Sequence, residues 1–218
     1  MGIEEKQNEG FALGVKRSKW RTSPGMESGD REFAIVRPKI LSRDKNACQK
    51  CGVEMEGLHV HHRNDNHSDN RPGNLETQCE LDHAPHHIGM LGKKGKVVYV
   101  PGVSQVDISH LYRLISIAIM AGGELASDAR AIHEFLLGFS ILVEEVFGTS
   151  NPGDFGNALL ALSDTDYHGR HVSMEGLRVI FNPDSLSGFA TKAFKAGGFD
   201  KNNSPQLWDK IHSNYVER

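Results

Sequence analysis

Apolar residues recur at helical spacing in the second half of the chain. Ser104 and Asp107 resemble a capping box at the start of one helix, and Gly122-Gly123 ends it. Between these signals the apolar positions lie three or four residues apart, so that they share one helix face: Ile108, Leu111, Ile115 and Ile119. A second helix is predicted over residues 127–148 from the same spacing of large side chains: Ile132, Phe135, Leu136, Phe139, Leu142, Val143 and Val146.

The rest of this half gives weaker signals. A third, short helix is predicted over residues 155–162, and a terminal helix from Ser204-Pro205 through Trp208 and Ile211. Residues 167–200 show no clear pattern. The two long apolar stripes are expected to form mainly core, although a few exposed members would leave a groove for an amphipathic helix.

The first half of the chain carries shorter elements. A short helix is predicted over residues 38–44, with Pro38 in its first turn. Residues 63–73 are rich in Asn, Asp, Gly and Pro, which predicts a loop. Short strands are predicted at three places, two of them flanking this loop: residues 58–62, 75–79 and 96–100. A short helix carrying His83 and His87 should follow, with Pro85 in its first turn.

Composition narrows the class of protein. The chain has 218 residues, a formal net charge of −3 and a pI of about 6.5, so no global positive field attracts nucleic acid. No apolar run approaches a bilayer-spanning length, and no signal-peptide core follows Met1, so a cytoplasmic location without membrane insertion is expected. Three cysteines in such a compartment suit a metal better than a disulfide framework.

The densest chemistry lies between Cys48 and His87. This stretch holds all three cysteines and seven of the twelve histidines, which are the preferred soft ligands of zinc. It begins with Cys48-x-x-Cys51 and includes three further groups of candidate ligands: His59-x-His61-His62, Cys79-x-x-Asp82-His83 and His86-His87. Such a concentration indicates at least one bound metal and gives no sign of a small-molecule cofactor.

The stretch resembles the HNH, or ββα-metal, nuclease family. In that family a strand ends in an Asp-His or His-His pair, a loop supplies a central Asn, and a following helix supplies the last histidines. Here the matching residues are His61-His62, Asn74, and His83 with His87. The resemblance implies that His62 is the general base, that Asn74 holds the loop and orients that base, and that one catalytic divalent cation (Mg²⁺, Mn²⁺, Ni²⁺ or Zn²⁺) binds a set of three histidines: His61, His83 and His87.

The same resemblance implies a second, structural zinc ion. Many HNH proteins hold zinc with two Cys-x-x-Cys pairs, one before the first strand and one at the start of the last helix. Here the ligands would be Cys48, Cys51 and Cys79, with a departure at the fourth position, where Asp82 stands. A carboxylate can bind zinc, and His86 is the alternative fourth ligand. The alternative role for Asp82 is to cap the helix, and His59 and His67 are expected to be solvated.

Beyond this motif, the chain is similar to the IcmJ/DotN family of type IVB secretion coupling-complex components. The similarity covers roughly residues 30–165 and rests on four stretches: Lys39 to Gly52, Asn70-Arg71 before Asn74-Leu75, Val98 to Gln105, and Val143 to Gly156. It implies a zinc-bearing adaptor that contacts the helical tail of a coupling ATPase. The chain departs from such adaptors by keeping the whole HNH histidine set.

Two functions therefore compete. The leading hypothesis is a metal-dependent HNH endonuclease that hydrolyses DNA and is attached to a type IVB secretion or conjugation system. The alternative is a catalytically silent, zinc-binding adaptor that binds the coupling ATPase tail. The expected architecture is α+β, a zinc-stapled ββα-metal unit packed with a mainly α-helical C-terminal half. Its parts are a partly ordered arm, the metal unit and the helical half: residues 1–30, 31–102 and 103–218.

Overall fold

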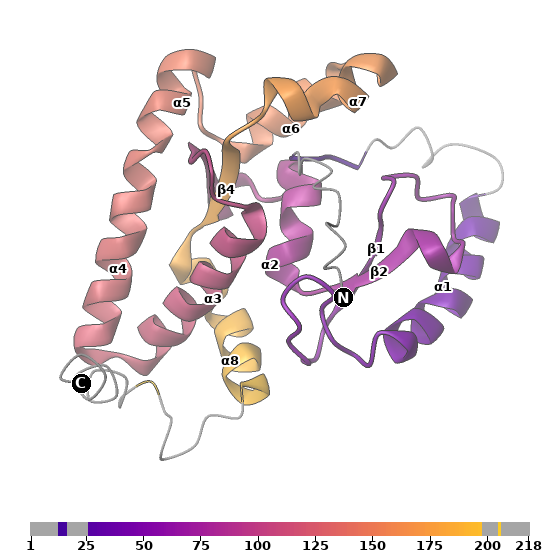
Figure 1. Ribbon diagram of the computed structural model, residues 1–218, viewed down its shortest axis with the longest axis horizontal. Coiled ribbons are helices and arrows are strands. Elements are labelled where there is room, and N and C mark those ends of the chain that lie inside the picture. The colour runs from indigo at the N-terminus through magenta and orange to yellow at the C-terminus, as the bar shows by residue number, and fades with distance from the viewer. Residues whose placement is uncertain (1–12, 17–25, 198–204, 206–218) are drawn as a thin grey trace, which may run out of the picture.

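The first sheet is formed by two short strands that flank the predicted loop. In the computed structural model, which describes residues 13–16, 26–197 and 205, β1 (His59–His62) pairs antiparallel with β2 (Leu75–Gln78), and His62 lies opposite Leu75. Helix α1 packs beside this sheet, and most of the remaining helices form the other side of the molecule (Figure 1). The predicted helix after Ser204 lies outside the described residues.

Helix α1 (Met26–Arg43) begins well before the position predicted for it. Pro38 lies inside the helix, although an interior proline typically costs about 3 kcal/mol of helix stability. The prediction placed the start at Pro38 and was wrong, because the apolar face of the helix extends upstream of the proline. That face packs on the first sheet through residues of both elements: Phe33, Val36, Ile40 and Leu41 with Val60 and Leu75.

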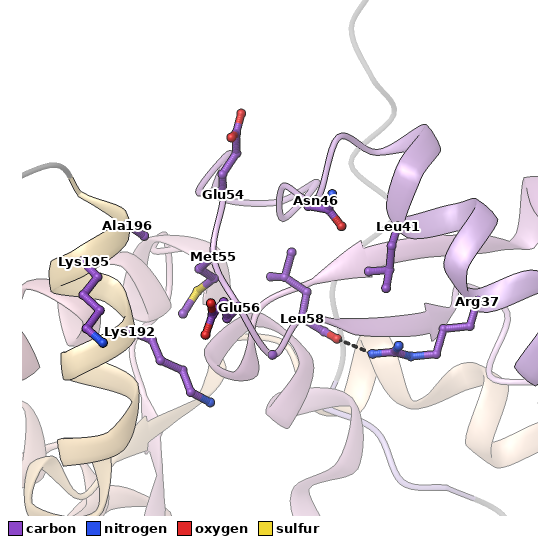
Figure 2. Close-up of a pocket in the computed structure, with 11 residues that line it drawn as sticks. Arg37, Leu41, Asn46, Glu54, Met55, Glu56, Leu58, Lys192, Lys195 and Ala196 are labelled. Carbon is purple, nitrogen blue, oxygen red and sulfur yellow. Dashed lines mark hydrogen bonds between the residues drawn. The ribbon is translucent and has the colours of Figure 1, made fainter.

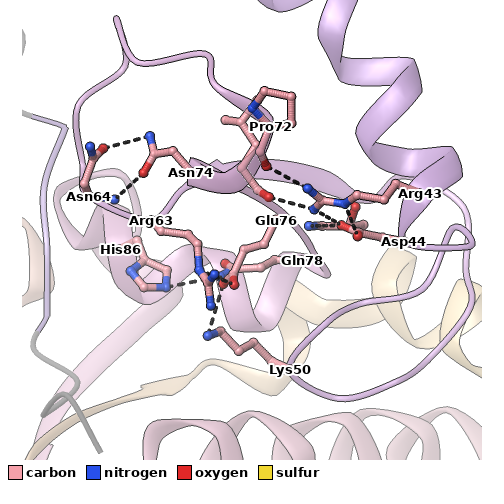
Figure 3. Close-up of polar contacts among 12 residues, drawn as sticks. Arg43, Asp44, Lys50, Arg63, Asn64, Pro72, Asn74, Glu76, Gln78 and His86 are labelled. Carbon is pink, nitrogen blue, oxygen red and sulfur yellow. Dashed lines mark hydrogen bonds and ion pairs between the residues drawn. The ribbon is translucent and has the colours of Figure 1, made fainter. Parts of the chain in front are cut away.

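The C-terminal end of α1 is clamped to β2 by polar contacts (Figure 3). Arg43 donates hydrogen bonds to the carbonyl oxygens of Pro72 and Leu75, at 2.6 and 2.7 Å. The carboxylate of Asp44 accepts the backbone N–H of Thr77 at 2.9 Å. These contacts fix the start of the Cys48 turn relative to the sheet, and a further bond from Gln49 N–H to the Thr77 carbonyl continues the attachment.

The predicted helix carrying His83 and His87 is interrupted. Helix α2 (Glu80–His83) gives way to a 3₁₀ segment (Ala84–Met90), and His87 has a non-helical backbone with φ −137° and ψ 46°. Pro85 lies beyond the end of α2, in the first turn of the 3₁₀ segment, and it has no N–H to donate to the Leu81 carbonyl four residues earlier. That carbonyl instead accepts the hydroxyl of Ser109 at 3.2 Å. His83 and His87 therefore do not share one regular helix turn.

A second antiparallel pair joins distant parts of the chain. β3 (Gly95–Tyr99) pairs with β4 (Leu177–Phe181), which lies in the segment without a clear sequence pattern. The amide of Gln105 closes this pair onto the next helix, since it donates to the Val179 carbonyl and accepts the Val179 N–H at 2.9 and 2.8 Å.

The helices that follow confirm the mostly helical second half. The capping box of Ser104 and Asp107 is present at the start of the first of them. The predicted helix over 127–148 begins earlier and breaks at Phe139, whose N–H bonds to the Leu136 carbonyl only three residues back. The helices are α3 (Gln105–Ala121), α4 (Gly123–Gly138), α5 (Ser140–Phe147), α6 (Pro152–Ala161), α7 (Asp164–Ser173) and α8 (Ser187–Ala196). None of the helices in the described ranges is long and apolar enough to cross a bilayer.

The stripe along α4 and α5 is mostly outside the core, which contradicts the expectation from its spacing. Only Leu136 and Val143 of its predicted members are buried. The core itself contains residues from both halves of the chain, including Leu81, Tyr112 and Phe181. The short N-terminal segment 13–16 also belongs to it: Gly14 N–H bonds to the Pro85 carbonyl, and the Gly14 carbonyl accepts Ile88 N–H.

Candidate metal centres

Three cysteines and one aspartate meet at the end of β2. Cys48 and Cys51 lie in the turn after α1, Cys79 caps the start of α2, and Asp82 lies in that helix. The Sγ atoms of Cys48 and Cys79 are each 3.2 Å from Oδ2 of Asp82, and the Sγ atoms of Cys51 and Cys79 are 4.0 Å apart. All four ligand atoms lie within 4.8 Å of one another.

These separations fit a tetrahedral zinc ion. Zn–S bonds of about 2.3 Å and Zn–O bonds of about 2.1 Å hold two sulfurs about 3.8 Å apart, and a sulfur and an oxygen about 3.6 Å apart. Oδ1 of Asp82 is buried without a hydrogen-bond partner. Burial and the neighbouring Cys48 raise the pKa of Asp82 to about 6, so the surroundings disfavour the charged carboxylate, and a bound cation would offset that cost. The cluster can therefore bind a metal such as zinc.

His86, the alternative fourth ligand, lies elsewhere. Its ring stacks on His61, with centroids 3.9 Å apart and an interplanar angle of 26°. On its other side His86 contacts a polar network: its Nε2 lies 3.5 Å from the amide nitrogen of Gln78, which donates to Glu76 (Figure 3). Glu76 also pairs with Lys50 and Arg63. Among the described residues, Asp82 is the side chain that completes the group of three cysteines.

His61, His83 and His87 form a second group of possible ligands. Their ligand nitrogens lie within 4.8 Å of one another, although the helix that should carry two of them is broken. The ring centroids are 5.6, 6.2 and 4.6 Å apart, and the ring planes cross at 77°, 72° and 63°. Rings that point at one ion from different directions, with nitrogens about 2.1 Å from it, have centroids roughly 4.5–6 Å apart. Two of the three separations fall in this range, and the 6.2 Å between His61 and His87 is slightly wider, so the three rings surround a position where a divalent cation could bind after a small adjustment.

The protonation state of these three rings also favours binding of a cation. Burial lowers the pKa of His61 and of His83 to about 2, and that of His87 to about 4, so all three are neutral imidazoles near pH 7. The Nδ1 atoms of His61 and His87 are buried without a hydrogen-bond partner. Metal ligation requires neutral imidazole and would satisfy such atoms.

A rival group shares His61 but fits a metal less well. One atom each of His61, Asp65 and His86 also lies within 4.8 Å of the others. The nearly parallel stack of His61 and His86 directs their in-plane nitrogens alongside each other, whereas ligation requires them to converge. Asp65 is already bound by Arg170 at 3.1 Å and by the Tyr167 hydroxyl at 3.4 Å.

His62, the general base expected from the HNH pattern, is buried within the protein. Only 3% of it is exposed. Its ring lies 5.1 Å from that of Phe33 in α1 and 4.7 Å from that of His67. Its Nε2 bonds to Oδ1 of Asn70 at 3.0 Å, and Asn70 in turn donates to Glu32 of α1 at 3.3 Å.

Asn74 holds the loop but does not orient His62. Its side chain accepts Asn64 N–H and donates to Oδ1 of Asn64 and to the Asp69 carbonyl. The expectation that it orients the base is wrong, because Asn70 contacts His62 instead. Sequence reasoning missed this role of Asn70, since the loop contains several asparagines and no spacing distinguishes one of them. It also missed that His59 stacks on His83, with centroids 4.6 Å apart.

A cavity of about 610 Å³ lies apart from both metal groups, between α1, residues 54–58 and α8 (Figure 2). Its walls carry charges of both signs: Arg37, Glu54, Glu56, Lys192 and Lys195. Arg37 is held by a 2.9 Å bond to the Leu58 carbonyl. None of the predicted ligands or catalytic residues lines this cavity.

The chain is similar to a distant relative among known proteins. The chain is 28% identical over 138 residues to the Type 4 apparatus protein DotN of Legionella pneumophila. The match covers 60% of this chain and 64% of the relative, which is less than two thirds of that protein's length. No protein-family model matches the chain, the HNH family included.

Proposed function

We propose that this chain is a metal-stapled adaptor of a type IV secretion apparatus, and not a working nuclease. The burial of His62 is the observation that carries the proposal. A general base must reach the water that attacks the phosphate, and catalytic metals keep one ligand position open to substrate. Here α1 covers His62 through Phe33, and Asn70 occupies its Nε2.

The distant relative supports the same assignment. Its name places that protein in a type 4 apparatus, and the similarity extends over 138 residues, well beyond the cysteine and histidine stretch of this chain. An adaptor needs a metal only to stabilise its structure. A metal bound by the cysteine group would stabilise a segment that has few large apolar side chains of its own. On this proposal the chain works on the cytoplasmic side of the apparatus, and its helical half binds the helical tail of a coupling ATPase.

Genetic complementation tests the adaptor function. In the native host, deletion of the gene should impair type IV transfer, and His62→Ala should restore transfer as well as the wild type does. Cys48→Ser should not restore it, because the metal group is lost. Affinity-tagged wild-type chain should recover the coupling ATPase, identified by mass spectrometry. A folded His62→Ala protein that fails to restore transfer would contradict the proposal and favour catalysis.

A second candidate function is favoured by one observation, the convergence of His61, His83 and His87. A divalent cation held by these rings would supply binding of the scissile phosphate and stabilisation of its charge. If the site works, His62 takes the proton from the attacking water, and α1 must move to let DNA reach it. This remains the HNH endonuclease hypothesis.

Plasmid cleavage separates the two functions. Wild type, His62→Ala and the surface control His171→Ala are compared with Mg²⁺, Mn²⁺, Ni²⁺ and Zn²⁺. For an active nuclease, His62→Ala should lose roughly a hundredfold to ten-thousandfold in rate, and His171→Ala should lose nothing. The adaptor proposal expects the same background in all three proteins.

A further inference from the structure

Helices α4 and α5 stand end to end at one edge of the molecule (Figure 1). Five apolar side chains on these helices form an exposed stripe. We call these residues the α4–α5 stripe: Ile132, Phe135, Phe139, Leu142 and Val146. Their spacings along the chain are three, four, three and four residues, as at the a and d positions of a coiled coil. All five are exposed, with Phe135 at 68% and Val146 at 67%.

The break between the helices does not interrupt the stripe. Phe139 has φ −73° and ψ −4°, which stays in the right-handed helical region, so the second helix continues the first. The neighbouring face, with Leu136 and Val143, is buried against the rest of the molecule. One face of the two helices therefore belongs to the core. The adjacent α4–α5 stripe is not covered by any element in the described part of the chain.

The α4–α5 stripe borders a groove. Leu142 and Val146 line a cavity of about 370 Å³ together with Tyr99 and Leu177 of the second sheet. A second cavity of about 220 Å³ adjoins it, sharing Phe147 and Ser173 with it, and is lined further by apolar side chains of α6 and its surroundings: Phe155, Ala158, Leu159, Leu162 and Met174. A helix laid along the stripe would thus find pockets for its own apolar anchors.

The charges around the stripe are acidic. By helical geometry, Glu134 and Glu145 lie along its outer edge, on the side away from the buried face. Glu175 lines the groove on the opposite side, and Asp154 lines the adjoining cavity. Three basic residues nearby are already paired with acidic side chains: Arg130 with Asp184, Arg170 with Asp65, and Lys96 with Glu144 of α5.

We propose that the α4–α5 stripe is the docking site for an amphipathic helix whose apolar face is flanked by lysine or arginine. Charge complementarity selects this occupant over a second copy of the chain, because two copies would bring their own Glu134 and Glu145 together. The inference rests on the proposed adaptor function and gives the location and chemistry of its partner contact.

A binding experiment tests the site directly. The probes are two capped helical peptides with leucine at heptad positions a and d, one with lysine and the other with glutamate at e and g. The full chain should bind the lysine peptide at least roughly tenfold more tightly than the glutamate peptide. Added salt should weaken that preference. Phe135→Asp and Leu142→Asp should abolish binding, while the control Met90→Asp, at an exposed apolar residue outside the stripe, should bind normally.

Folding of each variant is checked by circular dichroism and bound zinc. Equal binding of the two peptides, or normal binding by the folded Phe135→Asp and Leu142→Asp proteins, would overturn the inference. A wild-type dimer that both substitutions convert to a monomer would overturn it too, in favour of self-association.

Recovery of the coupling ATPase from the host separates this inference from the adaptor function. Loss of recovery with Leu142→Asp, and not with Met90→Asp, supports both. Recovery by all variants overturns the docking site and leaves the adaptor function standing. If wild type recovers no apparatus component, the adaptor function fails, and the peptide experiment alone decides whether the stripe binds a basic helix.

Discussion

Asp82 is the single residue that distinguishes the cysteine group from a four-thiolate zinc site. One of its oxygens lies 3.2 Å from each of two thiols, and the other is buried without a partner. Such a carboxylate is costly to bury unless a cation neutralises it. A cysteine at the same place would supply the same charge and a softer ligand atom.

We expect Asp82→Cys to keep zinc and Asp82→Ala to lose it. Even outer contacts of a metal site contribute about 10–100-fold to affinity, so loss of a direct ligand should cost on the order of 100-fold or more. Zinc content by mass spectrometry and competition with a chromogenic chelator measure the change. Glu80→Ala, an exposed carboxylate in the same helix, is the control. Equal zinc affinity of Asp82→Ala and wild type would exclude Asp82 as a ligand.

At the scale of elements, α6 approaches the broken histidine segment through two glycines. A Cβ atom on Gly156 would clash with Cα of Gly89 and would lie 2.9 Å from the nitrogen of Gly89. Both contacts are with backbone, which cannot move aside as a flexible side chain can. The segment that carries His87 can therefore pack this closely against α6 only because Gly156 has no side chain.

Gly156→Ala should destabilise the protein by about 1–3 kcal/mol, the usual range for overpacking a tight contact. Gly169→Ala provides a matched control in α7, because a Cβ there meets no atom within 4 Å. That substitution should be stabilising by up to about 1 kcal/mol, since alanine favours a helix interior more than glycine does. Urea unfolding of both variants tests the pair, and equal midpoints would disprove the tight contact.

At the scale of the whole molecule, the metal groups sit beside a core that both halves of the chain share. Cys48 and Cys79 belong to the same buried cluster as Tyr112 and Phe181. The segment around the cysteines contributes few large apolar side chains of its own, so its order depends strongly on ligation. Most of the buried residues of that cluster come from β3 onward, so we expect the second half to persist without ligation.

Zinc removal should therefore loosen residues 45–90 first. Hydrogen exchange after chelator treatment should rise in that segment and stay low in α3 and β4, and the thermal melt should broaden or shift downward. Cys48→Ser and Cys79→Ser should reproduce this state without chelator, whereas His62→Ala should fold normally. An unchanged melt and exchange pattern in metal-free protein would show that ligation does not hold the segment.

The sequence by itself determined the local features of this protein. The capping box at Ser104 and the helical second half follow from spacing, because their geometry is set within a few residues. The grouping of Cys48, Cys51 and Cys79 with Asp82 was expected from the HNH resemblance, which left His86 as the alternative fourth ligand. The stripe over 132–146 could also be read from spacing alone, but not whether it faces core or solvent.

Only the tertiary structure decided which distant elements pair and which side chains are buried or exposed. The pairing of β3 with β4, separated by many residues, left no local signal that sequence patterns could show. The covering of His62 by α1 and Asn70 depends on how a helix packs over a sheet, and so does the exposure of the α4–α5 stripe. Periodicity specifies that a face is apolar, whereas packing of distant elements determines what, if anything, covers it.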